Sequence, residues 1–235
     1  MKATVKEKTE VAKRTLMVVF DLLGKEVDFV PGQYFWVELP DRGYHDERGL
    51  RRHISIVTSP NERGVLGLAT RLRESAFKHT LSQLDVGDEV VVEEPKGDYH
   101  LPEDTSKEYV FVAGGIGITV FRSMLKYIAE EKLPYRVTLV YSNRDLESTA
   151  FVDELRELEQ EIEGMQMVLT MTDDPTWEGD SRRIDAKFLR ELLGDLNGFT
   201  YLVAGPPAMV NSVADSLEEA GVPEEQVLRS RFAGY

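Results

Sequence analysis

The chain has 235 residues, of which 42% are hydrophobic and 30% charged, a composition typical of packed globular proteins and long enough for two domains. It contains no cysteine, which excludes disulfides, thiolate zinc sites and cysteine-held iron–sulfur clusters within this chain. The formal net charge of −14 argues against general nucleic-acid binding. Most of that negative charge lies beyond residue 100, and the first hundred residues are almost neutral.

Nothing in the sequence indicates targeting or a metal site. Residues 1–13 lack the apolar core of a signal peptide, and the longest apolar-rich stretch, residues 109–121, is too short to cross a bilayer. We therefore expect a cytoplasmic protein without a membrane span. No two of the four histidines have metal-ligand spacing, so we expect no metal. The histidines are His45, His53, His79 and His100.

The first hundred residues show short apolar or alternating runs separated by turn residues. One helix is expected over residues 75–84. The pattern predicts an antiparallel Greek-key β-barrel domain over residues 1–100. The expected strands are residues 4–9, 15–22, 34–39, 53–58, 64–70 and 89–93.

Beyond a linker at residues 95–107, strands and helices alternate. A βαβ series of this kind predicts a parallel sheet covered by helices on both faces, an α/β domain over residues 101–235. The expected strands are residues 109–112, 136–141, 165–169, 200–203 and 226–228. The expected helices are residues 118–130, 151–163, 186–193 and 208–220.

The first strand of this second domain turns into a helix through Gly114-Gly115-Ile116-Gly117. Glycines at such a turn let a phosphate approach backbone N–H groups at the positive end of the helix dipole. The spacing departs from the usual dinucleotide fingerprint, and a turn that serves packing alone is the alternative.

Three motifs in order resemble those of the ferredoxin–NADP reductase superfamily. Residues 51–56, RRHISI, resemble its R-x-Y-S flavin motif. Residues 113–119, AGGIGIT, resemble its nicotinamide-nucleotide phosphate loop, and residues 204–209, AGPPAM, resemble its C-G-P-P-x-M motif. The strand pattern between the motifs also fits, so the resemblance covers essentially the whole chain.

The resemblance implies a flavin site on the barrel. Arg52 would pair with a flavin phosphate, because a guanidinium fork matches phosphate geometry. His53 lies within the motif, and Ile54 stands where the family most often has an aromatic residue that packs on the flavin. Ser55 would lie near flavin N5 as a catalytic residue.

The start of the barrel helix falls where the family binds the flavin pyrophosphate. Ser75 can cap this helix, the N–H groups of Ala76, Phe77 and Lys78 can face a phosphate, and Lys78 adds positive charge. A plain amphipathic helix would explain the same residues. The resemblance thus makes this segment a candidate second half of the flavin site.

The same resemblance implies a nicotinamide-nucleotide site on the α/β domain. Ser142, Arg144 and Asp173 follow the next two strands and would face the adenosine ribose. Asp173 would repel a 2′-phosphate and slightly favour NADH, whereas Arg144 could pair with that phosphate. The residues expected around the pyrophosphate are Gly114, Gly115, Gly117, Thr119, Gly205 and Pro206.

These implications define an FAD-dependent NAD(P)H oxidoreductase that passes electrons to a separate acceptor such as a ferredoxin or another redox protein. The C-terminal Tyr235 would cover the flavin face that the nicotinamide must reach, as a second catalytic residue. An acidic acceptor would dock near Arg42, Arg48 and Arg51. Two alternatives remain: an electron-transfer subunit of a larger complex, and a regulatory module that binds NAD(P) without redox chemistry.

Overall fold

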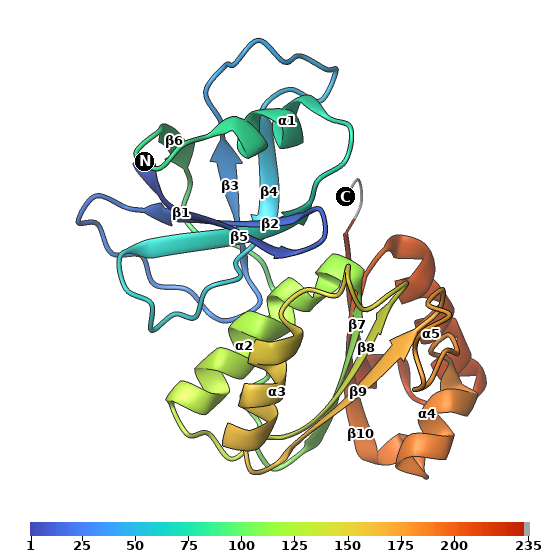
Figure 1. The fold of residues 1–235 in the computed structure, drawn as a ribbon. Coiled ribbons are helices and arrows are strands. Elements are labelled where there is room, and N and C mark those ends of the chain that lie inside the picture. The colour runs from blue at the N-terminus through green and yellow to red at the C-terminus, as the bar shows by residue number, and fades with distance from the viewer. Residues whose placement is uncertain (233–235) are drawn as a thin grey trace.

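The computed structural model describes residues 1–232 and contains two sheets. The first half forms a six-stranded antiparallel sheet in the order β4-β3-β6-β1-β2-β5, with one helix beside it (Figure 1). Its elements are β1 (Lys2–Ala12), β2 (Thr15–Asp21), β3 (Tyr34–Glu38), β4 (Arg51–Ser55), β5 (Val65–Arg71), α1 (Ala76–Gln83) and β6 (Glu89–Val92).

The antiparallel sheet curls around an apolar interior. In β2, Leu16, Val18 and Phe20 alternate into that interior, as the period of two in a strand requires. Just beyond β4, the Val57 N–H donates to the Gly67 carbonyl of β5 at 2.9 Å. This bond joins the two outer strands of the sheet and gives it the form of a barrel.

The second half forms a five-stranded parallel sheet in the order β11-β10-β7-β8-β9. Helices α2 and α3 cover one face and α4 and α5 the other (Figure 1). The elements are β7 (Glu108–Gly114), η1 (Gly115–Gly117), α2 (Ile118–Glu130), β8 (Arg136–Asn143), α3 (Val152–Glu161), β9 (Met165–Met171), α4 (Ala186–Leu193), η2 (Leu196–Gly198), β10 (Phe199–Gly205), α5 (Pro207–Glu219), η3 (Glu224–Gln226) and β11 (Val227–Arg231).

The two-domain fold predicted from the sequence is confirmed, with small differences at element ends. Strand β4 ends at Ser55, three residues before the predicted end, because the chain there turns into the buried segment Ile56–Ser59. The boundary at residue 100 remains a prediction. Within residues 1–232, no helix is both long and apolar enough to span a membrane.

Helix α2 lies between the two halves. Every residue from Ile118 to Leu125 is buried, because one side of the helix packs on the parallel sheet and the other meets the barrel. Figure 1 shows α2 directly below the barrel, with the ends of β7 and β8 beside its first turn. The helix begins directly after the turn at residues 114–117, which we call the glycine turn, and packs it against the barrel.

Candidate functional site

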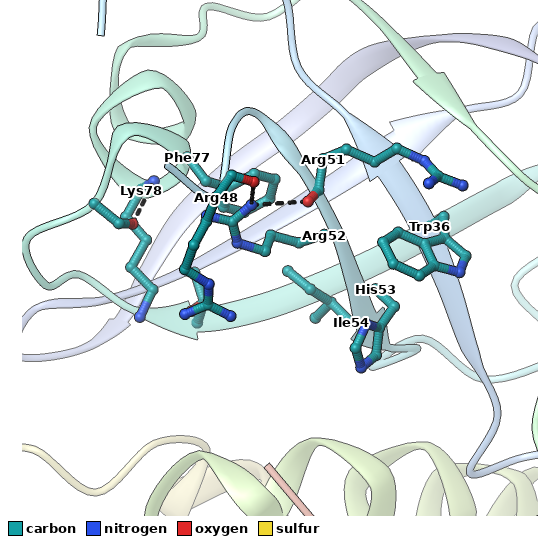
Figure 2. Close-up of a pocket in the computed structure, with 10 residues that line it drawn as sticks. Trp36, Arg48, Arg51, Arg52, His53, Ile54, Phe77 and Lys78 are labelled. Atoms are coloured by element: carbon teal, nitrogen blue, oxygen red, sulfur yellow. Dashed lines mark hydrogen bonds between the residues drawn. The ribbon is translucent and has the colours of Figure 1, made fainter. Parts of the chain in front are cut away.

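A cavity of about 470 Å³ opens at the barrel edge, between β4, the loop before it and α1. The structure brings together in its wall six of the residues predicted to bind the flavin (Figure 2). Ser55 and Ala76 are neighbours of wall residues but are not in the wall. The lining residues are Trp36, Arg48, Arg51, Arg52, His53, Ile54, Thr70, Ser75, Phe77 and Lys78.

Arg52 is held firmly by the loop that precedes its strand. Its Nη1 donates to the carbonyls of Arg48 at 2.6 Å, Gly49 at 2.9 Å and Arg51 at 2.8 Å. Its guanidinium carbon lies 5.5 Å from the centre of the Phe77 ring, which belongs to α1. A fixed, largely buried guanidinium in a cavity wall is suited to bind a phosphate group.

The first turn of α1 differs from the expectation. Ser75 caps the helix as predicted, with its Oγ accepting from the Lys78 N–H at 3.2 Å. The Ala76 N–H donates to Asp46 at 2.7 Å, and this bond is the main reason that the pKa of Asp46 lies below its usual range. The N–H groups of Ala76 and Lys78 are thus occupied and not open to a phosphate. Their place in a flavin site remains a prediction.

Lys78 contributes its charge to the cavity. It is buried, and burial together with the nearby cations Arg73, Arg48 and Arg52 lowers its pKa to about 8, burial being the larger cause. A lysine kept among arginines is costly unless an anion offsets the charge. This cluster of cations is the observation that fits a bound pyrophosphate.

The glycine turn is shaped for close backbone approach. Gly115 adopts a φ of +53°, in the left-handed region that favours glycine. A Cβ on Gly117 would lie 2.3 Å from the Ala204 carbonyl oxygen, so η1 packs directly on the end of β10. Two motifs that are far apart in the sequence therefore meet at one edge of the sheet.

Thr119, expected near the nucleotide pyrophosphate, has its side chain directed into the protein interior. Its side chain is buried, and its hydroxyl donates to the Ile116 carbonyl at 3.1 Å. The hydroxyl thus stabilises the turn from within, and a direct contact with a nucleotide remains a prediction.

Two adjoining cavities follow the carboxyl edge of the parallel sheet, and Pro206 lines both. The larger, about 450 Å³, contains the predicted Ser142 and Arg144. Asp173 is not in its wall, whereas Arg183, which no sequence motif had indicated, is. The complete wall consists of Ser142, Arg144, Thr172, Arg183, Ile184, Pro206, Ala208, Met209 and Ser212.

The smaller cavity, about 180 Å³, lies between the two halves of the chain. The barrel contributes Arg71 and Arg73 to it, opposite Gly115 and Ile116 of the glycine turn. Arg71 also donates to Asn143 Oδ1 at 2.8 Å and to the Ser148 carbonyl at 3.2 Å. The two arginines therefore face the nucleotide half, although they directly precede the segment predicted for the flavin. The remaining wall residues are Pro206, Pro207 and Phe232.

The end of β5 connects the flavin cavity with the nucleotide cavities. Thr70 lines the flavin cavity, and the next residue, Arg71, lines the cavity at the glycine turn. Adjacent residues of one strand thus line the two cavities in which the sequence predicts the flavin and the nucleotide.

Two remaining predictions have different outcomes. Arg42 and Arg51 of the proposed docking patch form ion pairs with Asp88 and Glu93, so the patch is less positive than its arginines suggest. Tyr235 lies outside the described residues.

Comparisons with known proteins agree with this geometry. A sequence model of the oxidoreductase FAD-binding domain matches residues 2–101, and one of the oxidoreductase NAD-binding domain matches residues 111–215. The two matches together cover most of the chain and define an oxidoreductase with an FAD-binding and an NAD-binding domain. The chain belongs to the ferredoxin–NADP reductase superfamily, so the predictions of family and cofactors are confirmed.

Two relatives show the range of systems in which similar chains occur. The chain is 29% identical over 201 residues to one subunit of the Na⁺-translocating NADH-quinone reductase of Psychrobacter cryohalolentis, covering 81% of this chain and 47% of that protein. It is 27% identical to reductase component 2 of the terephthalate 1,2-dioxygenase of Comamonas sp., covering 90% and 61%. The chain therefore spans about half to three fifths of these relatives.

Solved structures show the same fold along the whole chain. The FAD/NAD-binding domain of a nitric oxide dioxygenase from Vibrio cholerae superposes with a TM-score of 0.87 at 21% identity, and each chain covers 98% of the other. A ferredoxin–NADP⁺ reductase from Neisseria gonorrhoeae with bound FAD and NADP gives a TM-score of 0.81 at 19% identity, with the same coverage.

Proposed function

We propose that this chain oxidises NADH or NADPH on a bound FAD and passes the electrons to a separate acceptor, such as a ferredoxin or another redox protein. The observation that supports this most directly is the end of β5, where Thr70 and Arg71 line the flavin cavity and the nucleotide cavity. FAD, when bound, supplies the ability to accept a hydride and to release electrons singly.

The protein's own part is binding and alignment. Arg52 and Lys78 provide the positive charge for the flavin pyrophosphate, and Ile54 provides an apolar surface for the ring. Arg71 and the glycine turn are placed to hold the nucleotide pyrophosphate against the barrel. Holding two reactants at a fixed distance and orientation is itself a large part of catalysis. For Ser55, which is half-buried at the end of β4 next to wall residue Ile54, we propose the role near the reacting atoms that the family resemblance implies.

The residues around the larger cavity lead us to propose a nucleotide preference that differs from the one expected from the sequence. Arg144 and Arg183 both line the larger cavity, and none of the described residues in its wall is acidic. Asp173, from which the sequence predicts a preference for NADH, is outside this wall. Two guanidinium groups favour a 2′-phosphate, so the proposal includes a preference for NADPH.

An absorbance spectrum tests the proposed function. The purified chain, loaded with FAD, should show flavin absorbance that disappears when NADPH or NADH is added without oxygen. Arg52→Ala should weaken FAD binding by about 1.5–3 kcal/mol, since it removes a charge-assisted contact. A chain that binds nucleotide but cannot be loaded with flavin would instead be the non-redox regulatory module.

The acceptor defines the remaining alternative, an electron-transfer subunit of a larger complex. The matching subunit of the Na⁺-translocating NADH-quinone reductase and the dioxygenase reductase component are both longer than this chain. The alternative holds if the isolated chain reduces small dyes but transfers electrons to a ferredoxin or another redox protein only when it is assembled with the other subunits of a complex.

A further inference from the structure

Helix α2 carries a buried arginine whose role is not explained by either cofactor site. The side chain of Arg122 is 8% exposed. Its Nε and Nη2 donate to the two carboxylate oxygens of Glu154 on α3, each at 2.7 Å. Its guanidinium carbon also lies 4.9 Å from the centre of the Phe151 ring. This two-point ion pair fixes the plane of the guanidinium.

The remaining nitrogen of Arg122 crosses to the barrel. Nη1 donates to the Val57 carbonyl at 2.6 Å, and the neighbouring Ser123 hydroxyl donates to the Thr58 carbonyl at 2.7 Å. Consecutive residues of α2 therefore bind consecutive carbonyls of the barrel. Both bonds are buried, which makes their loss expensive, because the carbonyls would lose their partners away from water.

The other polar contacts between the α2 segment and the barrel lie nearer the surface. Lys126, one turn further along the helix, pairs with Glu62 at 2.9 Å, and its side chain is 21% exposed. Glu131, just beyond the helix, accepts from Asn61 at 2.7 Å in an exposed position. Partly exposed pairs of this kind contribute little to a fixed geometry.

The Arg122–Val57 contact is only a few residues along the chain from the flavin motif on one side and from the glycine turn on the other. Val57 follows Ser55 of the flavin motif by two residues. Arg122 follows Gly117 of the glycine turn by five residues, about one and a half helical turns. A change at this contact would move the glycine turn relative to β4 without altering any residue in the wall of the flavin cavity or of the two nucleotide cavities.

We propose that Arg122, oriented by Glu154, is a positioning residue that sets the distance and angle between the nucleotide and the flavin. The inference depends on the proposed function for its catalytic consequence. Its structural consequence, a fixed orientation of the two halves, is independent of any cofactor. Because a displacement of about 1 Å can slow a reaction about a hundredfold, the limiting rate should respond strongly.

The kinetic test compares Arg122→Gln with Lys126→Gln, which removes an ion pair at the edge of the same interface. Flavin reduction by nucleotide is followed in the FAD-loaded chain by stopped-flow absorbance without oxygen. For Arg122→Gln we expect the limiting rate to fall at least about tenfold, while the dissociation constant of FAD changes little, because its cavity lies within the barrel half, and that of the nucleotide changes less than the rate. Arg122→Lys should recover part of the rate, and Lys126→Gln should match the unmodified chain.

The orientation test uses the absence of native cysteine. Spin labels on Val91→Cys in β6 and Glu157→Cys in α3, both exposed positions, report the distance between the halves by pulsed electron resonance. Arg122→Gln should broaden or shift the distance distribution, and Lys126→Gln should not. If Arg122→Gln is poorly folded, Ser123→Ala replaces it, with a smaller change in the same direction.

Several results would overturn the proposal. One is an unchanged distance distribution and limiting rate in Arg122→Gln; another is a loss of rate that follows loss of FAD or nucleotide binding. Equal effects of Arg122→Gln and Lys126→Gln would also do so. If the unmodified chain is not reduced by either nucleotide, the proposed function fails, and the spin-label distances alone decide whether Arg122 sets the orientation.

Discussion

Lys78 changes charge close to neutral pH, because burial and three nearby arginines lower its pKa to about 8. A bound pyrophosphate favours the protonated form and raises this pKa. FAD affinity should therefore be highest below pH 8 and should fall as the pH rises through that value, by up to about tenfold per pH unit. Fluorescence titration of FAD about one pH unit below and above the pKa measures the effect.

The matched variant for this prediction is Lys78→Gln, which keeps length and polarity but cannot be charged. It should bind FAD more weakly than the unmodified chain below pH 8 and show no pH dependence across the same range. An equally steep pH dependence in Lys78→Gln would show that a different group titrates.

Arg183 is the residue whose placement most alters the interpretation of the nucleotide site. It lines the cavity with Arg144 at the carboxyl edge of the sheet, so Arg183→Ala should lower the second-order rate of flavin reduction by NADPH about tenfold and leave that by NADH almost unchanged. The expected size corresponds to the loss of one hydrogen bond to a charged group. If both nucleotides react equally fast with the unmodified chain, the 2′-phosphate is not recognised.

The position of η1 depends on its contact with β10. A Cβ at Gly117 would overlap the Ala204 carbonyl oxygen at 2.3 Å, so Gly117→Ala should displace the turn, destabilise the fold by about 1–3 kcal/mol and weaken nucleotide binding. Gly198→Ala is the control, because a Cβ there meets nothing within 4 Å. Thermal unfolding and nucleotide titration of both variants provide the measurement, and equal behaviour would contradict the argument.

The elements that follow from local patterns were predictable, and the contacts that depend on the path of loops were not. The Ser75 cap and the strand–glycine–helix turn were predictable because capping and tight turns are local. Asp46 reaches the start of α1 from a distant loop, and Arg183 lies in the irregular segment between β9 and α4. Neither residue belongs to a periodic pattern that would predict its position. Arg122 lies in a helix buried on both sides, where a single charged residue has no distinctive spacing.

An anionic nucleotide must bind a chain whose net charge is −14. Local positive charge can offset this repulsion at the junction of the halves, where Arg71 and Arg73 face the glycine turn. Burial lowers the pKa of Arg71, and the same side chain also bonds to Asn143 and Ser148 of the α/β half. Arg71 is therefore at once an interdomain contact and a candidate phosphate ligand.

Arg71→Ala should separate nucleotide binding from alignment. Removing a cation from the pyrophosphate position should raise the nucleotide dissociation constant at least about tenfold, with FAD affinity retained because Arg71 does not line the flavin cavity. The limiting rate should fall less than in Arg122→Gln, since the buried contacts of α2 with the barrel persist. Stopped-flow reduction over a range of nucleotide concentrations yields both constants. A change confined to the limiting rate would mean that Arg71 only joins the halves and that the nucleotide lies elsewhere.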